Sequence, residues 1–102
     1  MDRVAALTEI LAANPTDPFA RYGLAMELAG QGDLPRALEE FATLLGRSPD
    51  YTAGYFMAAQ TLVKASRSED AKRMLENGLA SAMRTRNSHA QAEMQAMLDE
   101  LS

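Results

Sequence analysis

The sequence has no cysteine and no tryptophan, and histidine occurs once, at position 89. The absence of cysteine excludes disulfide bonds, thiolate metal sites and cysteine nucleophiles. His89 has no evident relay partner, and no glycine-rich phosphate-binding motif is present. The adjacent acids Glu39-Glu40 and Asp99-Glu100 point about 100° apart on a helix, so neither pair can converge on one metal ion. We therefore expect a protein that is not an enzyme and that binds no cofactor and no metal.

Long hydrophobic runs are also missing. No stretch approaches the roughly 18–20 apolar residues that span a bilayer, and residues 1–15 lack the continuous apolar segment of a signal peptide. Fourteen acidic residues against ten basic ones give a formal net charge of −4. Such a field repels nucleic acid and anionic lipid. The sequence predicts a cytoplasmic protein that binds neither nucleic acid nor a membrane.

The 102 residues are 47% hydrophobic and 24% charged, which is typical of one folded domain. Apolar residues recur at spacings of three and four from end to end, and this period predicts an all-α fold. Proline and glycine mark the breaks between the periodic stretches. We expect six helices, over about residues 3–13, 18–30, 35–48, 52–65, 69–86 and 88–101.

Two local signals refine these helices. Asn77-Gly78 is a hairpin signal between strands, but here it lies within a helical apolar stripe, so we predict that the helix continues through it. Ser88 and Gln91 have the spacing of a capping box, which predicts where the last helix begins.

An internal period of 34 residues organises the chain. Pro15 and Pro49 are separated by this interval. The same offset relates several apolar residues: Leu11 and Leu45, Leu28 and Leu62, Ala25 and Ala59, Ala37 and Ala71. Two helices in each period correspond to one helical hairpin per repeat.

In this register the residues resemble the tetratricopeptide repeat family. The residues of 18–51 that match the family pattern are Leu24, Ala25, Leu28, Ala37, Phe41, Leu44 and Pro49. Those of 52–85 are Tyr55, Ala58, Ala59, Leu62, Ala71 and Leu75. Three positions depart from the pattern. Arg21 stands where the family has a large apolar residue, Gly78 stands at a position that is usually alanine, and Met83 stands at the position of the closing proline.

The resemblance implies a small bacterial-type repeat protein, a stack of antiparallel helical hairpins that forms a fragment of a right-handed superhelical solenoid. We expect a single domain over residues 1–102. Its predicted parts are an N-terminal half-repeat helix (1–17), two repeats (18–51 and 52–86) and a C-terminal capping helix (87–102). Phe41 is expected in the core between the two hairpins.

In the family, the first helix of each repeat lines a groove that binds other proteins. The matching positions of this chain include Phe19, Tyr22, Met26, Phe56, Gln60 and Lys64. The resemblance therefore implies a protein-interaction module that binds a peptide or protein segment in this groove. The aromatic residues predict a partner with an apolar anchor, and Lys64 predicts acidic residues near that anchor. The alternative is a structural role, in which the same aromatic surface is buried in a homodimer or a longer assembly.

Overall fold

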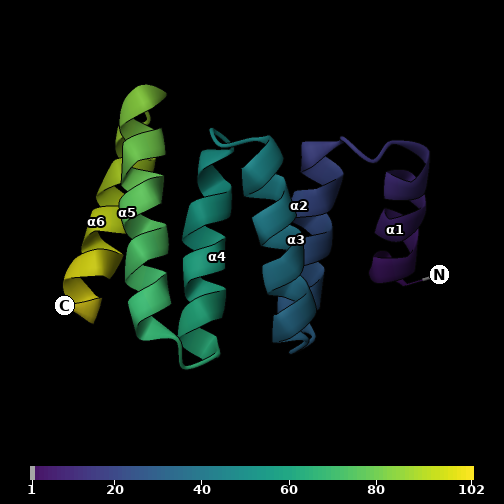
Figure 1. The fold of residues 1–102 in the computed structure, drawn as a ribbon, viewed down its shortest axis with the longest axis horizontal. Coiled ribbons are helices and arrows are strands. Elements are labelled where there is room, and N and C mark those ends of the chain that lie inside the picture. The colour runs from purple at the N-terminus through teal and green to yellow at the C-terminus, as the bar shows by residue number, and fades with distance from the viewer. Residues whose placement is uncertain (1) are drawn as a thin grey trace.

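A computed structural model describes residues 2–102, and helices account for most of that range (Figure 1). The helices are α1 (Arg3–Ala13), α2 (Pro18–Gly30), α3 (Leu34–Arg47), α4 (Thr52–Lys64), α5 (Ser68–Arg84) and α6 (Ser88–Leu101). The all-α prediction is confirmed, and each expected range agrees with the structure to within two residues. Helix α5 runs without a break through Asn77-Gly78, as predicted.

Side chains cap four of the helices. The capping residues, each accepting a hydrogen bond from a backbone N–H three residues further on, are Asp2, Asp17, Asp33 and Asn87. Pro18 and Pro35 lie in the first turns of α2 and α3, where their missing N–H groups would have no helical partner. These local signals place the helix starts.

The predicted capping box of the last helix is wrong. Asn87 Oδ1 accepts a hydrogen bond from Ala90 N at 3.0 Å, so Asn87 is the N-cap and Ser88 is the first helical residue. Asparagine is as good an N-cap residue as serine. Because it stands one position earlier, it takes the role that the spacing of Ser88 and Gln91 suggested.

Helices α2, α4 and α5 end in the same way. The turn after each contains one residue with positive φ, namely Gly32 (84°), Ser66 (60°) or Arg86 (55°). This conformation is open to glycine without strain and costs energy for other residues. It reverses the chain direction and lets the next helix lie antiparallel to the one before it.

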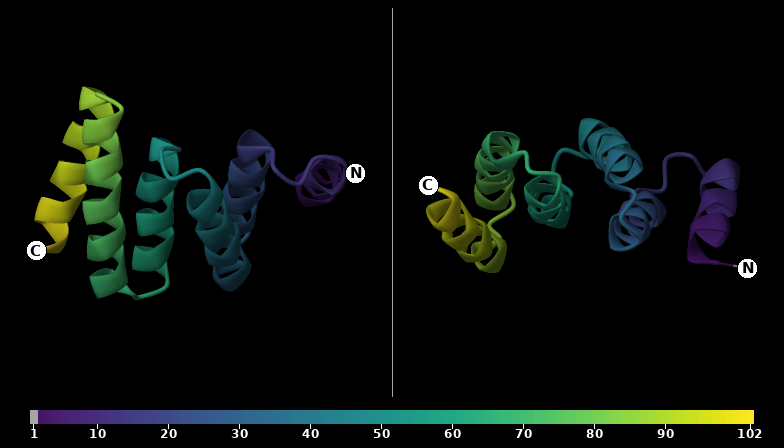
Figure 2. Two further views of the ribbon diagram at one scale, coloured as in Figure 1. Left: turned by 45° about the horizontal axis from the view of Figure 1, so that its top comes forward. Right: turned by 90° about the horizontal axis from the view of Figure 1, so that it is seen from below.

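The helices form two layers. In the right-hand view of Figure 2, α2, α4 and α6 lie in one row and α3 and α5 in the other, with α1 beside α2 at the N-terminal end. Neighbours in sequence pack against one another, above all α2 with α3, α4 with α5 and α5 with α6. The body measures 40 × 29 × 19 Å.

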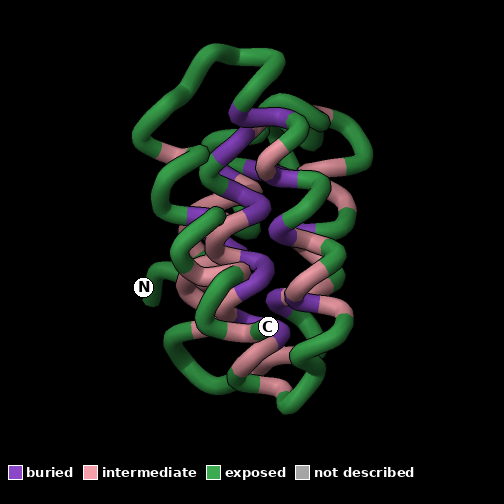
Figure 3. Tube along the Cα trace, turned by 90° about the vertical axis from the view of Figure 1, so that its left-hand side faces the viewer, coloured by how far each residue is buried: buried purple, intermediate pink, exposed green. Residues whose placement is uncertain are grey.

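The core lies between these two layers, where the buried residues follow a continuous seam (Figure 3). Phe41 is 1% exposed and belongs to a cluster with Leu24, Leu28 and Leu44. The predicted burial of Phe41 is therefore confirmed. A second cluster, which includes Leu75 and Met94, extends the core toward the C-terminus.

Arg21 stands at a position where the family pattern has a large apolar residue, and it makes polar contacts there instead of apolar packing. Its guanidinium lies 2.5 Å from Glu40 Oε1 and donates a second hydrogen bond to the Pro15 carbonyl at 3.0 Å. At the matching slot of the next hairpin, Tyr55 is buried and its hydroxyl donates to the Pro49 carbonyl at 2.7 Å. Both side chains tie their helix to the loop before it.

The part of the chain that the structure describes contains no helix long and apolar enough to cross a lipid bilayer. Residues 2–102 likewise contain no group of three or more His, Asp or Glu side chains placed to hold a metal ion.

Candidate functional site

Two hollows lie side by side on the α2, α4 and α6 layer. The first has a volume of about 350 Å³, and the residues that line it include Tyr22, Ala53, Phe56, Met57, Ala90 and Glu93. The second measures about 380 Å³ and is lined by Phe56, Gln60, Glu93, Ala96, Met97 and Glu100. Because Phe56 and Glu93 line both, the two hollows form one continuous depression. We call it the groove.

Tyr22 forms the α2 side of the groove. Its ring lies 5.2 Å from the ring of Tyr51 in a tilted arrangement and 6.5 Å from that of Phe41, edge to face. Burial, with the neighbouring Tyr51 as a second cause, raises the pKa of the Tyr22 hydroxyl above its ordinary value. The hydroxyl therefore stays neutral at physiological pH, and Tyr22 offers the groove an apolar ring that its neighbours hold in place.

Phe56 is the central side chain of the groove. It projects from α4, is half-buried, and packs against the C-terminal core cluster while lining both hollows. Gln60 follows one helical turn later and lines the second hollow. Of the six site residues predicted from the sequence, the structure brings Tyr22, Phe56 and Gln60 together around the groove.

The other three predicted residues lie elsewhere. Phe19, near the start of α2, is 76% exposed and lines neither hollow. Met26 packs against the N-terminal core cluster. Lys64, at the end of α4, is exposed, is absent from the lining of both hollows, and makes no ion pair with another residue of the described range 2–102.

Helix α6 provides a wall of the groove that the sequence analysis missed. Its contributing residues are His89, Ala90, Glu93, Ala96, Met97 and Glu100. The sequence predicted only a capping helix here and did not indicate that the same helix lines the groove. One signal was available, because α6 begins 36 residues after α4 and so continues the spacing of the helices that line the groove.

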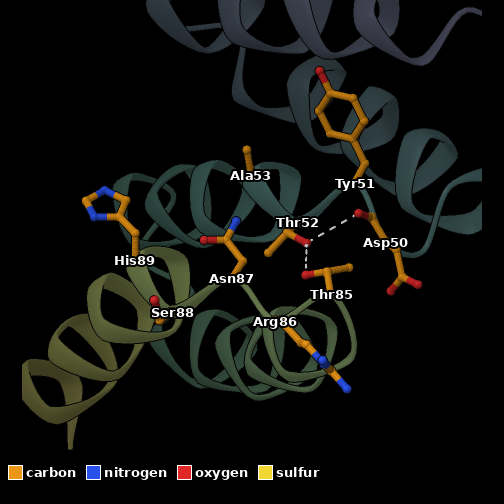
Figure 4. A pocket seen from close by; sticks show the side chains of 9 residues that line it. All are labelled: Asp50, Tyr51, Thr52, Ala53, Thr85, Arg86, Asn87, Ser88 and His89. Carbon is orange, nitrogen blue, oxygen red and sulfur yellow. Dashed lines mark hydrogen bonds between the residues drawn. The ribbon is translucent and has the colours of Figure 1, made fainter.

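A further hollow of about 630 Å³ opens at the end where α4 and α6 begin (Figure 4). Thr52 lies at its centre, hydrogen-bonded to Ser81 at 2.9 Å and within 3.4 Å of Thr85. This hollow shares Thr52, Ala53 and Asn87 with the first hollow of the groove. It is a polar entrance to the groove.

The opposite layer has its own depression, about 620 Å³, between α3 and α5. Phe41 and Leu62 lie at its base. Arg67 and Arg73 line it too, but both are paired with Asp70, the first at 2.8 Å. The charges at this site are thus already largely used within the fold.

Comparison with known sequences decides the family. A sequence profile of the tetratricopeptide repeat matches residues 28–98, which is more than half of the chain. The chain belongs to the tetratricopeptide repeat family. A TPR (tetratricopeptide repeat) protein of Pseudomonas aeruginosa is 28% identical to it over 98 residues, covering 96% of this chain and 93% of that protein.

Solved tetratricopeptide repeat structures share the fold. The solution structure of a tetratricopeptide repeat domain protein from Salinibacter ruber has a TM-score of 0.82 and 28% identity, covering 87% of this chain and 90% of that one. The TPR2B domain of yeast Sti1, solved in complex with pHsp70, has a TM-score of 0.89 and 18% identity, covering 96% of this chain and 78% of that one. The stacked hairpins are therefore the tetratricopeptide repeat fold.

Proposed function

We propose that this chain is a protein-interaction module whose groove binds a short segment of a partner protein. The observation that carries the proposal is the continuous depression along α4 and α6, which Tyr22 and Phe56 line while they also pack against the two core clusters. The yeast TPR2B domain, which has the same fold, was solved as a complex with pHsp70, and this supports a binding role.

The chemistry of the lining indicates an apolar anchor in the partner. Tyr22, Phe56 and Met57 give the first hollow an apolar side, and its volume of about 350 Å³ is within the usual range of ligand pockets. Rigid aromatic rings bind at a low cost in conformational entropy, while methionine adapts its shape to the ligand. Tyr22, Phe56 and Met57 are accordingly the side chains that would supply most of the affinity.

The test is to select random nine-residue peptides on the immobilised full chain and to titrate the best binder against variants. Phe56→Ala and Tyr22→Ala should each weaken binding by more than about 1 kcal/mol, roughly a fivefold loss of affinity. Phe19→Ala is the matched control, because it removes an exposed aromatic ring that lines neither hollow. Each variant is first checked for an unchanged helical circular dichroism spectrum.

Equal affinity of wild type and both groove variants would contradict the proposal. Sedimentation of the free chain addresses self-association through the same surface. A monomer leaves the groove open to a partner, whereas a tight dimer that Phe56→Ala dissociates would assign the aromatic surface to assembly.

A further inference from the structure

Charges of one sign line the groove. Glu93 lines both hollows and Glu100 lines the second. The Glu93 side chain is 47% exposed, and Glu100 is also exposed. Among residues 2–102, none of those lining these two hollows is a lysine or an arginine. The groove therefore combines an apolar floor with an acidic wall.

The cations near the groove leave this acidic character in place. His89 Nε2 lies 3.3 Å from Glu93 Oε1, so a protonated His89 pairs with that one carboxylate. Lys64 is not part of the lining and lies beyond the 4 Å ion-pair distance from Glu100. Arg86 belongs to the entrance hollow and not to the groove itself. Glu100 makes no ion pair within the described residues.

We propose that the segment bound by the groove carries basic residues beside its apolar anchor. This inference rests on the proposed function, since it concerns the ligand of the same groove. It reverses the charge predicted from the sequence, where Lys64 suggested acidic residues in the partner. The reason is the position of α6, which brings two carboxylates to the apolar side chains while Lys64 stays outside.

The spacing of the two carboxylates refines the expected pattern. Glu93 and Glu100 are seven residues apart on one helix, which corresponds to about 10 Å along its axis at 1.5 Å per residue. An extended chain covers that distance in about three residues. A segment lying along α6 with its apolar anchor in the first hollow would therefore place lysine or arginine at two positions about three residues apart.

The test repeats the selection of random nine-residue peptides, displayed on phage, in parallel on three forms of the full chain. The buffer contains about 0.05 M salt, so that charge interactions are weakly screened. The forms are the wild type, the double variant Glu93→Gln with Glu100→Gln, and the control Glu76→Gln. The control removes an exposed acid of α5 that lines neither hollow of the groove. Wild type and control should enrich peptides that carry lysine or arginine near an apolar residue. The double variant should enrich the apolar residue without the basic excess.

Titration of the best basic peptide measures the size of the effect. Each glutamine substitution should weaken binding about two- to fivefold, and the loss should shrink at about 0.5 M salt, because exposed charge pairs are weak and screened. Lys64→Gln should leave the affinity for the basic peptide unchanged or raise it, since it removes a positive charge near the groove that would repel the peptide.

The outcomes separate this inference from the proposed function. Enriched peptides that depend on Tyr22 and Phe56 but are neutral or acidic would overturn the basic ligand and leave the groove as the binding site. The same holds if basic peptides bind the double variant as tightly as the wild type. Selection that yields no binder, or binders indifferent to Tyr22 and Phe56, would overturn the groove itself and the charge inference with it.

Discussion

Two junctions join the helical hairpins to the helix that follows each of them, the first between α3 and α4 and the second between α5 and α6. They use opposite arrangements of large and small residues. At the first, Leu44 and Leu45 of α3 pack against Gly54 of α4, where an added Cβ would lie 3.0 Å from Leu45 Cδ2 and 3.2 Å from Leu44 Cδ2. At the second, the glycine is Gly78 of α5, where an added Cβ would meet Met94 of α6 as well as Tyr55 of α4. Leu44 and Gly78 occupy the same position of the 34-residue period.

This difference shows that one position of the repeat can hold a large or a small residue when its partner has the complementary size. A close approach needs one small and one large partner, and either helix can provide the small one. Gly78, which departs from the family pattern, leaves room on α5 for both Met94 of α6 and Tyr55 of α4. Because α6 also forms a wall of the groove, the packing at Gly78 positions Glu93 and Glu100.

The largest expected effect is at the first junction. Phe41→Ala removes a ring that is 1% exposed and should lower the free energy of unfolding by about 3–5 kcal/mol. Denaturant titration measures this loss, and Phe19→Ala, at a site 76% exposed, is the control expected to change little. A loss below about 1 kcal/mol for Phe41→Ala would mean that the junction does not depend on this ring.

The second junction should respond to an added methyl group. Gly78→Ala would place Cβ 2.6 Å from Tyr55 Cβ and also in contact with Met94 Sδ. We expect a loss of about 1–3 kcal/mol from overpacking, although alanine is the better helix former. Gly46→Ala, in α3 with no atom near the new Cβ, should instead stabilise by about 0.5–1 kcal/mol. Equal changes in thermal stability for the two substitutions would contradict close packing around Gly78.

The turns that follow α2 and α4 offer a smaller comparison. Gly32 after α2 and Ser66 after α4 are 34 residues apart and both have positive φ. Ser66→Gly removes the strain of the left-handed conformation but frees the unfolded chain, so we expect a net gain of about 0.5 kcal/mol. Thermal unfolding of this variant beside Gly32→Ser, which should be destabilising, measures both. A destabilised Ser66→Gly protein would show that the strain is negligible.

The smallest effect concerns the ion pair between Asp50 and Arg84, which has no counterpart one period earlier in the chain. Hydrogen bonding from Arg84, at 2.8 Å, holds the pKa of the Asp50 carboxyl below its ordinary value, whereas Thr16 occupies the matching position one period earlier. A lowered native pKa stabilises the fold above the ordinary aspartate value of about 3.9 and loses that contribution as pH falls through the native value. The stability difference between wild type and Asp50→Asn should therefore vanish in acid. A difference that persists unchanged at pH 2 would exclude this cause.

Much of the architecture follows from local sequence signals. The 34-residue period, Pro18, Pro35 and Gly32 predict the helices and their breaks, and the structure confirms them. Pro18, Pro35 and Gly32 act within a few residues of their own positions, and the period can be read from the sequence without knowledge of the tertiary fold. The family resemblance, and not these local signals, singled out Tyr22 and Phe56, and both side chains line the first hollow.

The rest of the site depends on packing that a single sequence does not display. On α6, Glu93, Ala96 and Glu100 have the composition of a solvated helix face, and the docking of this helix through Met94 and its apolar neighbours turns that face toward Phe56. Lys64 shares the period of the groove residues but lies one turn beyond Gln60, outside the lining. The sequence-based prediction of an acidic partner rested on Lys64, whereas the residues that line the groove include Glu93 and Glu100.

The proposed binding site depends on which layer of the fold meets the ligand. The decisive measurement is a ¹⁵N–¹H correlation spectrum of the labelled chain, titrated with the best selected peptide. We expect the largest chemical-shift changes at Tyr22, Phe56, Ala90 and Glu93, along the groove. Changes concentrated instead at Leu38 and Met74, in the depression between α3 and α5, would contradict the groove as the binding site.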